Sequence, residues 1–159
     1  MTETESEITR AAPSAVLQWT DDFLLGHRGI DRHHAEFVQV LQRLQQADDA
    51  ALAQEMEGLV QHLEAHFGAE NEQMEATAFP PRDCHMGEHA AVLQSVHDVQ
   101  QMLQVADPKA VTTCRALLVA LAEWFPAHTQ HLDSALAHWL VKQAAGGKPV
   151  IFKRDLNLR

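Results

Sequence analysis

The middle of the sequence carries two pairs of side chains that can bind metal ions, each pair separated by one helical turn. His66 precedes Glu70 by four residues, and His85 precedes His89 by the same interval. Residues four apart on an α-helix share a face and lie about 5–6 Å from one another, so both members of a pair can reach one ion. Two such pairs on facing helices predict a metal site inside a helical bundle.

The apolar residues around these pairs recur at steps of three and four, which is the period of amphipathic helices. The first helix is predicted to begin at Asp31, whose carboxylate would cap or charge the first turn. The second is predicted to follow a break and N-terminal cap at Asp48-Asp49. It should end near Ala78, because the sequence Phe79-Pro80-Pro81 cannot continue a helix.

Two further helices are predicted in the second half of the chain. The third begins after Pro81 and runs to Leu103. The fourth begins after Asp107-Pro108 and stops at Gly146-Gly147, since proline suits the first position of a helix and glycine the residue after its end. Four helices joined by short loops predict an all-α fold, an up-down-up-down four-helix bundle.

We expect a single folded domain, because 159 residues with 46% hydrophobic content can bury a core without disulfides. The four-helix domain is predicted to span residues 16–147. Residues 1–15 are expected to form a disordered leader, and residues 148–159 a short C-terminal tail. Val16 to Ile30 is expected to pack across the bundle as an N-terminal arm with little regular structure, turned by its glycines.

Net charge and hydropathy indicate which classes of partner and which cellular compartment are expected. A net charge of −10 with only 12 lysines and arginines disfavours nucleic acid, which requires clustered positive charge. We find no apolar run of about 18 residues that would span a membrane, and the acidic N-terminus is unlike a signal peptide. Cys84 and Cys114 are expected to be free thiols in a reducing compartment. We therefore expect a cytoplasmic protein, and we expect a monomer.

Projected on the predicted helices, seven metal-capable side chains face the interior of the bundle. They are His34, His66, Glu70, His85, His89, His128 and Asp133. Five imidazoles and two carboxylates exceed the three or four ligands of a mononuclear zinc site. They fit two metal ions, with the carboxylates free to bridge them. Ligation by many nitrogens and a few carboxylates is compatible with iron.

The order of these residues resembles the hemerythrin family in its bacterial, single-domain form. A first histidine is followed by the spacings HxxxE, HxxxH and HxxxxD, and the resemblance covers Trp19 to about Leu140. Similar segments surround the motifs: Gly26 to Asp31, His66-Phe67 with Glu70 and Met74, Phe79-Pro80, and Trp124-Phe125. The resemblance implies a non-haem di-iron centre, oxo- or hydroxo-bridged, that binds O2 reversibly in a carrier, store or supply protein rather than an enzyme.

The resemblance also implies roles within the set. His85, His89 and His128 would hold a coordinatively full iron, and the remaining two histidines the iron with an open position. Glu70 and Asp133 would bridge the two irons. A protein that senses oxygen or redox state, or that senses or scavenges nitric oxide, would use the same centre. The sequence leaves that choice open.

Two other classes of metalloprotein are alternatives. His85-x-x-Glu88-His89 matches a zinc-peptidase motif in which Glu88 would be the general base, but a peptidase also needs a third ligand and a substrate cleft. A ferritin-like di-iron oxidase would need a Glu-x-x-His pair on each of two helices, and the nearest match is Asp31-x-x-His34.

Several polar residues near the motifs are not predicted to be ligands. Glu72 and Glu88 are interpreted as solvated side chains of helix faces. His33 is predicted to lie at the surface or behind the ligands. An outer role behind the ligands is not favoured for His62, one turn before His66.

The fourth helix raises a geometric conflict. His128 and Asp133 are five residues apart, and an ideal α-helix turns about 500° over five residues, which leaves them about 140° out of phase. We therefore predict a π-type bulge or opened turn between Pro126 and Asp133. Thr129 stands where the family usually has an apolar residue. Its hydroxyl could hold a water near the site or bond to the carbonyl of Phe125.

Overall fold

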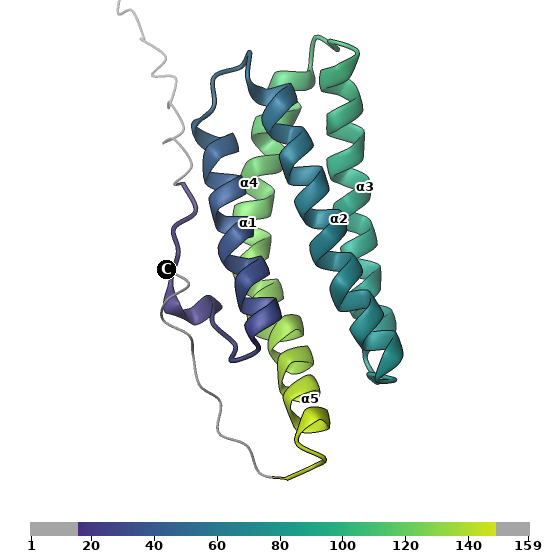
Figure 1. The fold of residues 1–159 in the computed structure, drawn as a ribbon. Helices are drawn as coiled ribbons and strands as arrows, with labels where there is room; N and C mark the ends of the chain where they lie inside the picture. The colour runs from purple at the N-terminus through teal and green to yellow at the C-terminus, as the bar shows by residue number, and fades with distance from the viewer. Residues whose placement is uncertain (1–15, 149–159) are drawn as a thin grey trace, which may run out of the picture.

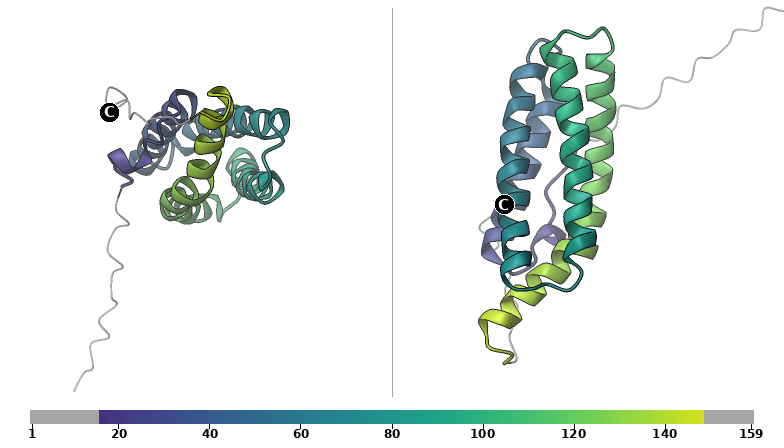
Figure 2. Two further views of the ribbon diagram at one scale, coloured as in Figure 1. Left: turned by 90° about the horizontal axis from the view of Figure 1, so that it is seen from below. Right: turned by 90° about the vertical axis from the view of Figure 1, so that its right-hand side faces the viewer.

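Four long helical stretches stand side by side in the computed structural model, which describes residues 16–148 (Figure 1). The helices are α1 (Arg28–Gln46), α2 (Leu52–Ala76), α3 (Arg82–Gln104), α4 (Ala110–His128) and α5 (Ser134–Ala144), with two short turns, η1 (Asp21–Phe23) and η2 (Thr129–Asp133). α4, η2 and α5 together form the fourth stretch, and α5 leaves the line of α4 at an angle (Figure 2). The predicted all-α bundle is confirmed.

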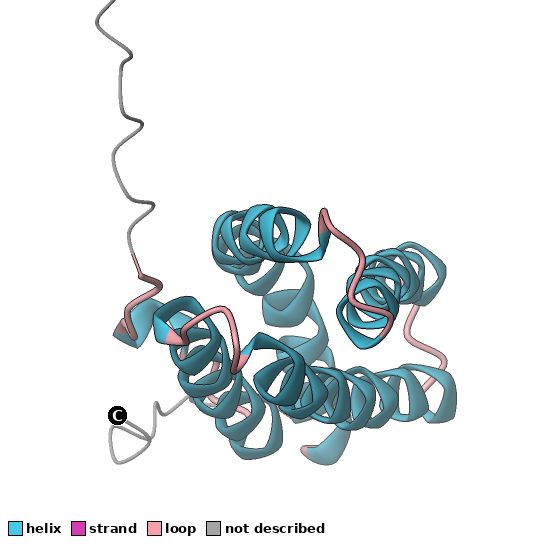
Figure 3. Cartoon of the chain, turned by 90° about the horizontal axis from the view of Figure 1, so that it is seen from above, coloured by secondary structure: helices cyan, strands magenta, loops and turns pink. Residues whose placement is uncertain are grey.

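The predicted leader and nearly all of the predicted tail lie outside the described residues. The described part begins at Val16 and ends at Lys148, and all of its regular structure is helical (Figure 3). The predicted domain boundaries stay predictions.

One large apolar core fills most of the bundle. It takes residues from all four helical stretches, for example Leu41, Leu63, Val96 and Leu118, none of which exposes more than 2% of its surface. Burying one such side chain stabilises the fold by about 1.5–3 kcal/mol. The steps of three and four residues in the sequence therefore mark the face of each helix that packs inward.

A second, smaller apolar cluster closes the other end of the bundle. It consists of Ile30, Met74, Phe79, Leu136 and Ala137. The predicted metal-capable residues lie near the boundary between the two clusters, as His34 lies between Ile30 and Phe37. Any polar side chain in this layer is sealed by apolar packing on both sides.

The first helix begins three residues earlier than predicted. α1 starts at Arg28, and the residue before it, His27, accepts the N–H of Ile30 through Nδ1 at 3.3 Å. Asp31 is therefore not at the cap but buried inside the first turn. Its carboxylate accepts the backbone N–H groups of Leu25 at 2.6 Å and Gly26 at 3.0 Å. Asp31, the predicted cap, instead ties the arm to the helix through these two bonds. Gly26 adopts a φ of 85°, which turns the chain so that both N–H groups face the carboxylate.

The N-terminal arm lies against α1, as Figure 1 shows. Leu17 donates its N–H to Gln45 at 2.9 Å and accepts from the side chain of Gln42 at 2.8 Å. The arm contains one turn, η1, in a segment that was expected to hold little regular structure. The arm matters to the interior because it buries Phe23 against the core.

The ends of α2 differ by a few residues from the prediction. Asp48 accepts the N–H of Ala51 at 2.9 Å, but the residue that precedes α2 is Ala51, whose side chain makes no capping bond. The aspartate thus caps a turn before the helix. α2 ends at Ala76, two residues before the predicted end. Ala78 adopts a φ of 50°, which a helix cannot continue through.

The statement that the sequence holds no apolar run long enough to span a membrane needs a correction. The continuous helical stretch Ala110–Ala144 is long and apolar enough to cross a membrane by length and composition alone. The core helix of a soluble protein has the same composition, and Leu118, Leu121 and Phe125 of this stretch are buried in the bundle core. The absence of a membrane span stays a prediction.

Candidate metal centre

All seven predicted side chains lie in the buried layer between the two apolar clusters. None of them exposes more than 4% of its surface. The ligand atoms of one group, Glu70, His85, His89, His128 and Asp133, lie within 4.8 Å of one another, as do those of a second group, His34, His66 and Glu70. The two groups share Glu70. We refer to His34 and His66 as the two-histidine side, and to His85, His89 and His128 as the three-histidine side.

The predicted distortion of the fourth helix is confirmed and brings its two residues together. Thr129–Asp133 forms a π-helical turn, in which the N–H of Ser134 bonds to the carbonyl of Thr129 five residues earlier. Pro126 lies just before it, inside α4, where its ring has no N–H to donate and crowds the preceding turn. The step of five residues restores a common face to His128 and Asp133.

Each of the five histidines turns its Nε2 atom to the centre. On the two-histidine side, Nε2 of His34 contacts Asp133 at 2.9 Å, and that of His66 contacts Glu70 at 3.0 Å. On the three-histidine side, Nε2 of His128 lies 3.2 Å from the Nε2 atoms of both other rings. Bonds of about 2.0–2.1 Å from a metal to nitrogen can span such separations.

The two carboxylates each place one oxygen on each side. Glu70 presents Oε1 to the two-histidine side and Oε2 to the other, 3.4 Å from Nε2 of His89. Asp133 presents Oδ2 to His34, and its Oδ1 is 3.0 Å from Nε2 of His85. Neither Oε2 of Glu70 nor Oδ1 of Asp133 has a hydrogen bond among the described residues, although both are buried. Buried oxygens of this kind require another partner, and a metal ion supplies one.

The hydrogen bonds show that the layer requires cations. Nδ1 of His34 donates to the carbonyl of Phe23 at 2.9 Å, so Nε2 of the neutral ring carries a lone pair that faces Asp133. Two acceptors this close repel each other unless a proton or a metal ion lies between them. His128 is in the same position, because its Nδ1 donates to Glu88 at 2.9 Å and its Nε2 is 3.1 Å from Asp133.

In the metal-free protein, the surroundings favour protons at these two nitrogens. Burial lowers the pKa values of His34 and His128, but their contacts with Asp133 outweigh burial and raise both above the usual value. Burial alone would raise the pKa of Asp133, whereas its contacts with the histidines hold it well below the usual value. Burial, followed by the charge on His34, lowers the pKa of His66. Metal ions could replace these protons at the same nitrogens.

The outward Nδ1 atoms have unequal partners. His34 donates to the backbone carbonyl of Phe23, His89 contacts the amide oxygen of Asn71 and His128 donates to the carboxylate of Glu88, each at 2.9 Å. The Nδ1 atoms of His66 and His85 have no hydrogen-bond partner in the described part of the chain. Sequence reasoning missed Phe23, which acts through its backbone, and Asn71, which follows a predicted ligand but belongs to no motif.

The interpretation of Glu88 as a solvated side chain was incomplete. Its side chain is 51% exposed, yet its Oε2 accepts the N–H of His128 from the neighbouring helix. This contact also weighs against the zinc-peptidase alternative. Glu88 reaches the outer nitrogen of a ring whose other nitrogen faces the centre, so it does not stand where a base would activate a metal-bound water.

Two additional histidines lie behind the two-histidine side. The ring centres of His33 and His62 are 5.0 Å and 5.4 Å from that of His66. Burial, followed by the charges of neighbouring histidines, lowers the pKa of His62 to about 3, so this ring is neutral. The outer position that was not favoured for His62 is the one it occupies. The spacing of four residues from His66 was the signal.

Aromatic rings enclose the histidines. Phe67 stacks on His89 with ring centres 4.0 Å apart, and Trp124 lies against His128 at 4.3 Å. Phe125 meets His34 edge-on at 5.3 Å. These rings hold the imidazoles in place and keep the layer apolar around its polar centre.

Thr129 is fully buried, and its hydroxyl has no hydrogen-bond partner among the described residues. The expected alternative, a bond from this hydroxyl to the carbonyl of Phe125, is therefore not formed. That carbonyl accepts the backbone N–H of Thr129 instead. Thr129, at a position where the family usually has an apolar residue, thus places an unsatisfied hydroxyl directly after His128, a predicted ligand.

Fold and site together define a class of protein: a four-helix bundle with a buried histidine and carboxylate layer that can hold metal ions. The family model of the hemerythrin HHE cation binding domain matches residues 25–140. The chain therefore belongs to the hemerythrin family, as its motifs predicted, and this family binds iron and O2 and consists generally of proteins that are not enzymes.

Two relatives support this assignment. The bacteriohemerythrin of Ralstonia nicotianae is 33% identical over 128 residues, which cover 80% of this chain and 91% of that protein. The bacteriohemerythrin of Stenotrophomonas maltophilia is 26% identical over 127 residues, which cover 77% of this chain and 80% of that protein. No solved structure is significantly similar to the chain.

Proposed function

We propose that the seven side chains of the buried layer hold two irons and that the protein binds O2 reversibly there. The observation that carries the proposal is the placement of Glu70 and Asp133, each with one oxygen on the two-histidine side and one on the three-histidine side. A carboxylate that bridges two metals needs this arrangement, whereas a mononuclear site would not use it.

The number of donor atoms differs between the sides. The three-histidine side offers three imidazole nitrogens and two carboxylate oxygens, and the two-histidine side offers two nitrogens and two oxygens. The side with fewer donors retains a position for an external ligand. When bound, the irons supply the electrons that allow O2 to be held.

The chain's own residues keep water away from that side. Phe37 and Phe125 pack together with ring centres 4.5 Å apart, and Phe23 packs on Phe125 at 4.9 Å. Phe125 also contacts His34 directly. A dry apolar wall limits the access of water and protons, which favours release of O2 unchanged over its reduction.

The metal content tests the proposal. Purified protein is expected to contain two irons per chain by elemental analysis and native mass spectrometry, and to develop a visible absorption band when the reduced protein meets O2. The band should disappear when O2 is removed. One zinc with no iron, or a band that never forms, would contradict the proposal.

We further propose that the working unit is a cytoplasmic monomer. All seven side chains come from one chain, so the layer needs no second subunit. Cys84 is exposed and Cys114 buried, and both are free thiols, as a reducing compartment would allow. Light scattering of the purified protein tests the first point, and fractionation of the source cells the second.

A further inference from the structure

Glu88 is the one charged group on the outer side of the five imidazoles in the described part of the chain. We propose that Glu88 is a positioning residue: it fixes the tautomer and orientation of His128 and makes the three-histidine side the more electron-rich half of the centre. The inference rests on the proposed iron centre. It concerns a carboxylate that is not among the seven proposed ligands.

The contact crosses from one helix to another. Glu88 belongs to α3 and directly precedes His89, whereas His128 ends α4. Because a carboxylate only accepts, the 2.9 Å contact places the proton of His128 on Nδ1 and leaves Nε2 to face the centre. Trp124 lies against the same ring with centres 4.3 Å apart. A hydrogen bond and a ring contact together fix the imidazole.

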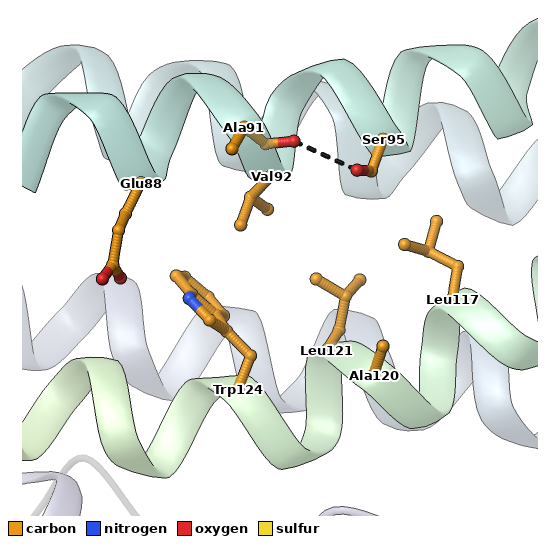
Figure 4. Close-up of a pocket in the computed structure, with 8 residues that line it drawn as sticks. All are labelled: Glu88, Ala91, Val92, Ser95, Leu117, Ala120, Leu121 and Trp124. Atoms are coloured by element: carbon orange, nitrogen blue, oxygen red, sulfur yellow. Dashed lines mark hydrogen bonds between the residues drawn. The ribbon is translucent and has the colours of Figure 1, made fainter.

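Glu88 stands where a substitution can be made without damage to the core. It lies at one end of a groove of about 360 Å³ between α3 and α4, beside Trp124 (Figure 4). The groove is otherwise lined by mostly apolar residues such as Val92 and Leu121. The side chain of Glu88 is 51% exposed, so its replacement by glutamine changes charge and leaves packing intact.

The other outer contacts are weaker because they are uncharged. His34 uses a backbone carbonyl and His89 an amide, while the carboxylate of Glu88 forms a charge-assisted bond of roughly twice the strength. A carboxylate behind an imidazole increases the basicity of the nitrogen that binds the metal. The effect should favour the ferric over the ferrous state on the three-histidine side.

The first test needs no metal. In metal-free protein labelled with 15N-histidine, the Nδ1 proton of His128 should give a strongly downfield, slowly exchanging NMR signal. That signal should disappear in Glu88→Ala and persist in Glu123→Gln, which removes an exposed carboxylate from α4 five residues before His128. A signal unchanged in Glu88→Ala would overturn the inference, even if the protein bound no iron at all.

The second test uses the iron-loaded protein. Glu88→Gln keeps an oxygen that accepts the N–H but removes the charge, so the ferrous state should gain about tenfold over the ferric state, a rise of about 59 mV in the midpoint potential of a one-electron step. Glu123→Gln should leave the potential within a few millivolts of the native value. Equal potentials for the two variants, with both loaded by two irons, would overturn the inference and leave the proposed function intact.

Discussion

The two sides of the buried layer use the same ligand types but differ in what stands behind them. On the three-histidine side, Glu88 and Asn71 hold outer nitrogens, and Phe67 stacks on His89. One histidine on each side, His85 and His66, has no hydrogen bond at its outer nitrogen among the described residues. On the two-histidine side, His34 bonds only to the backbone carbonyl of Phe23, and two further imidazoles lie behind His66, one of them the neutral His62.

Under the proposed function, this difference explains how one bundle would give two metals different roles. Oriented, charge-supported imidazoles hold a metal firmly in a fixed geometry. Imidazoles without a charged partner, beside a smaller donor set, leave room for exchange of an external ligand. Both sides share the carboxylates of Glu70 and Asp133, so the asymmetry arises from the third histidine on one side and from the surroundings of the imidazoles.

Replacement of Asp133 should impair metal binding on both sides of the layer, because this carboxylate contacts histidines of both sides. In Asp133→Asn the amide no longer supplies a bridging charge, and iron content should fall from two to below one per chain. Loss of one partner from buried charged contacts should also destabilise the metal-free protein by about 3–5 kcal/mol. Iron analysis and urea unfolding measure the two effects, with Glu123→Gln as control. Retention of two irons by Asp133→Asn would show that the aspartate is not a bridge.

The surroundings of the two-histidine side can be tested through pH. His62 has a pKa of about 3 in the folded state and about 6.5 when unfolded, so between about pH 3 and pH 6.5 only the unfolded chain takes up this proton. The free energy of unfolding of the metal-free protein should therefore fall by about 2 kcal/mol through this group between pH 7 and pH 5.

His62→Gln cannot take up the proton and should flatten the pH dependence by that amount. Urea unfolding at the two pH values measures it, and the exposed His97, in the variant His97→Gln, provides the control. Identical pH dependence in native protein and His62→Gln would mean that the pKa of His62 is the same in the folded and the unfolded chain, so that its surroundings do not hold this ring neutral.

Much of the fold and of the candidate ligand set could be predicted from the sequence, and the reasons are local. The spacing of one helical turn predicts that His66 and Glu70 act together. The spacing of five residues, which puts His128 and Asp133 on different faces of an α-helix, predicts the π turn. Both inferences depend only on helix geometry. The apolar steps similarly predict the core, although α1 starts at Arg28, where His27 caps it, and not at Asp31.

The surroundings of the ligands could not be predicted in the same way. Glu88 meets His128 across 40 residues of sequence, and the pairing depends on how α3 and α4 rotate against each other. The carbonyl of Phe23 has no side-chain signal at all, because any residue carries a carbonyl. Contacts between elements depend on packing, whereas ligand spacing within one helix does not.

Asn71 allows the strengths of the two outer contacts on the three-histidine side to be compared. Its amide oxygen forms a neutral hydrogen bond with His89, and such a bond contributes about 0.5–1.5 kcal/mol. Asn71→Ala should therefore weaken ferrous iron binding by less than about tenfold. Competition against a chelator, with Glu88→Gln measured alongside, gives the order. A larger change in iron affinity for Asn71→Ala than for Glu88→Gln would reverse the assignment of the dominant partner.

The smallest expected effect concerns Thr129, which directly follows His128. Its hydroxyl is buried without a partner, and such an atom costs about 1–3 kcal/mol. Valine has nearly the same shape and no hydroxyl, so Thr129→Val should raise the stability of the metal-free protein by about 1 kcal/mol. Thr129→Ser keeps the hydroxyl, loses a methyl group and should show no gain.

The same pair of variants tests whether the hydroxyl brings water to the centre. A hydroxyl without a protein partner can hold a water molecule, and water close to bound O2 promotes its irreversible loss. Stopped-flow mixing of the reduced, iron-loaded protein with O2 follows the decay of the visible band, which should be slower in Thr129→Val than in native protein and no slower in Thr129→Ser. Equal decay in native protein and Thr129→Val, together with a gain in stability, would mean that the hydroxyl is dry and that the aromatic wall around His34 alone excludes water.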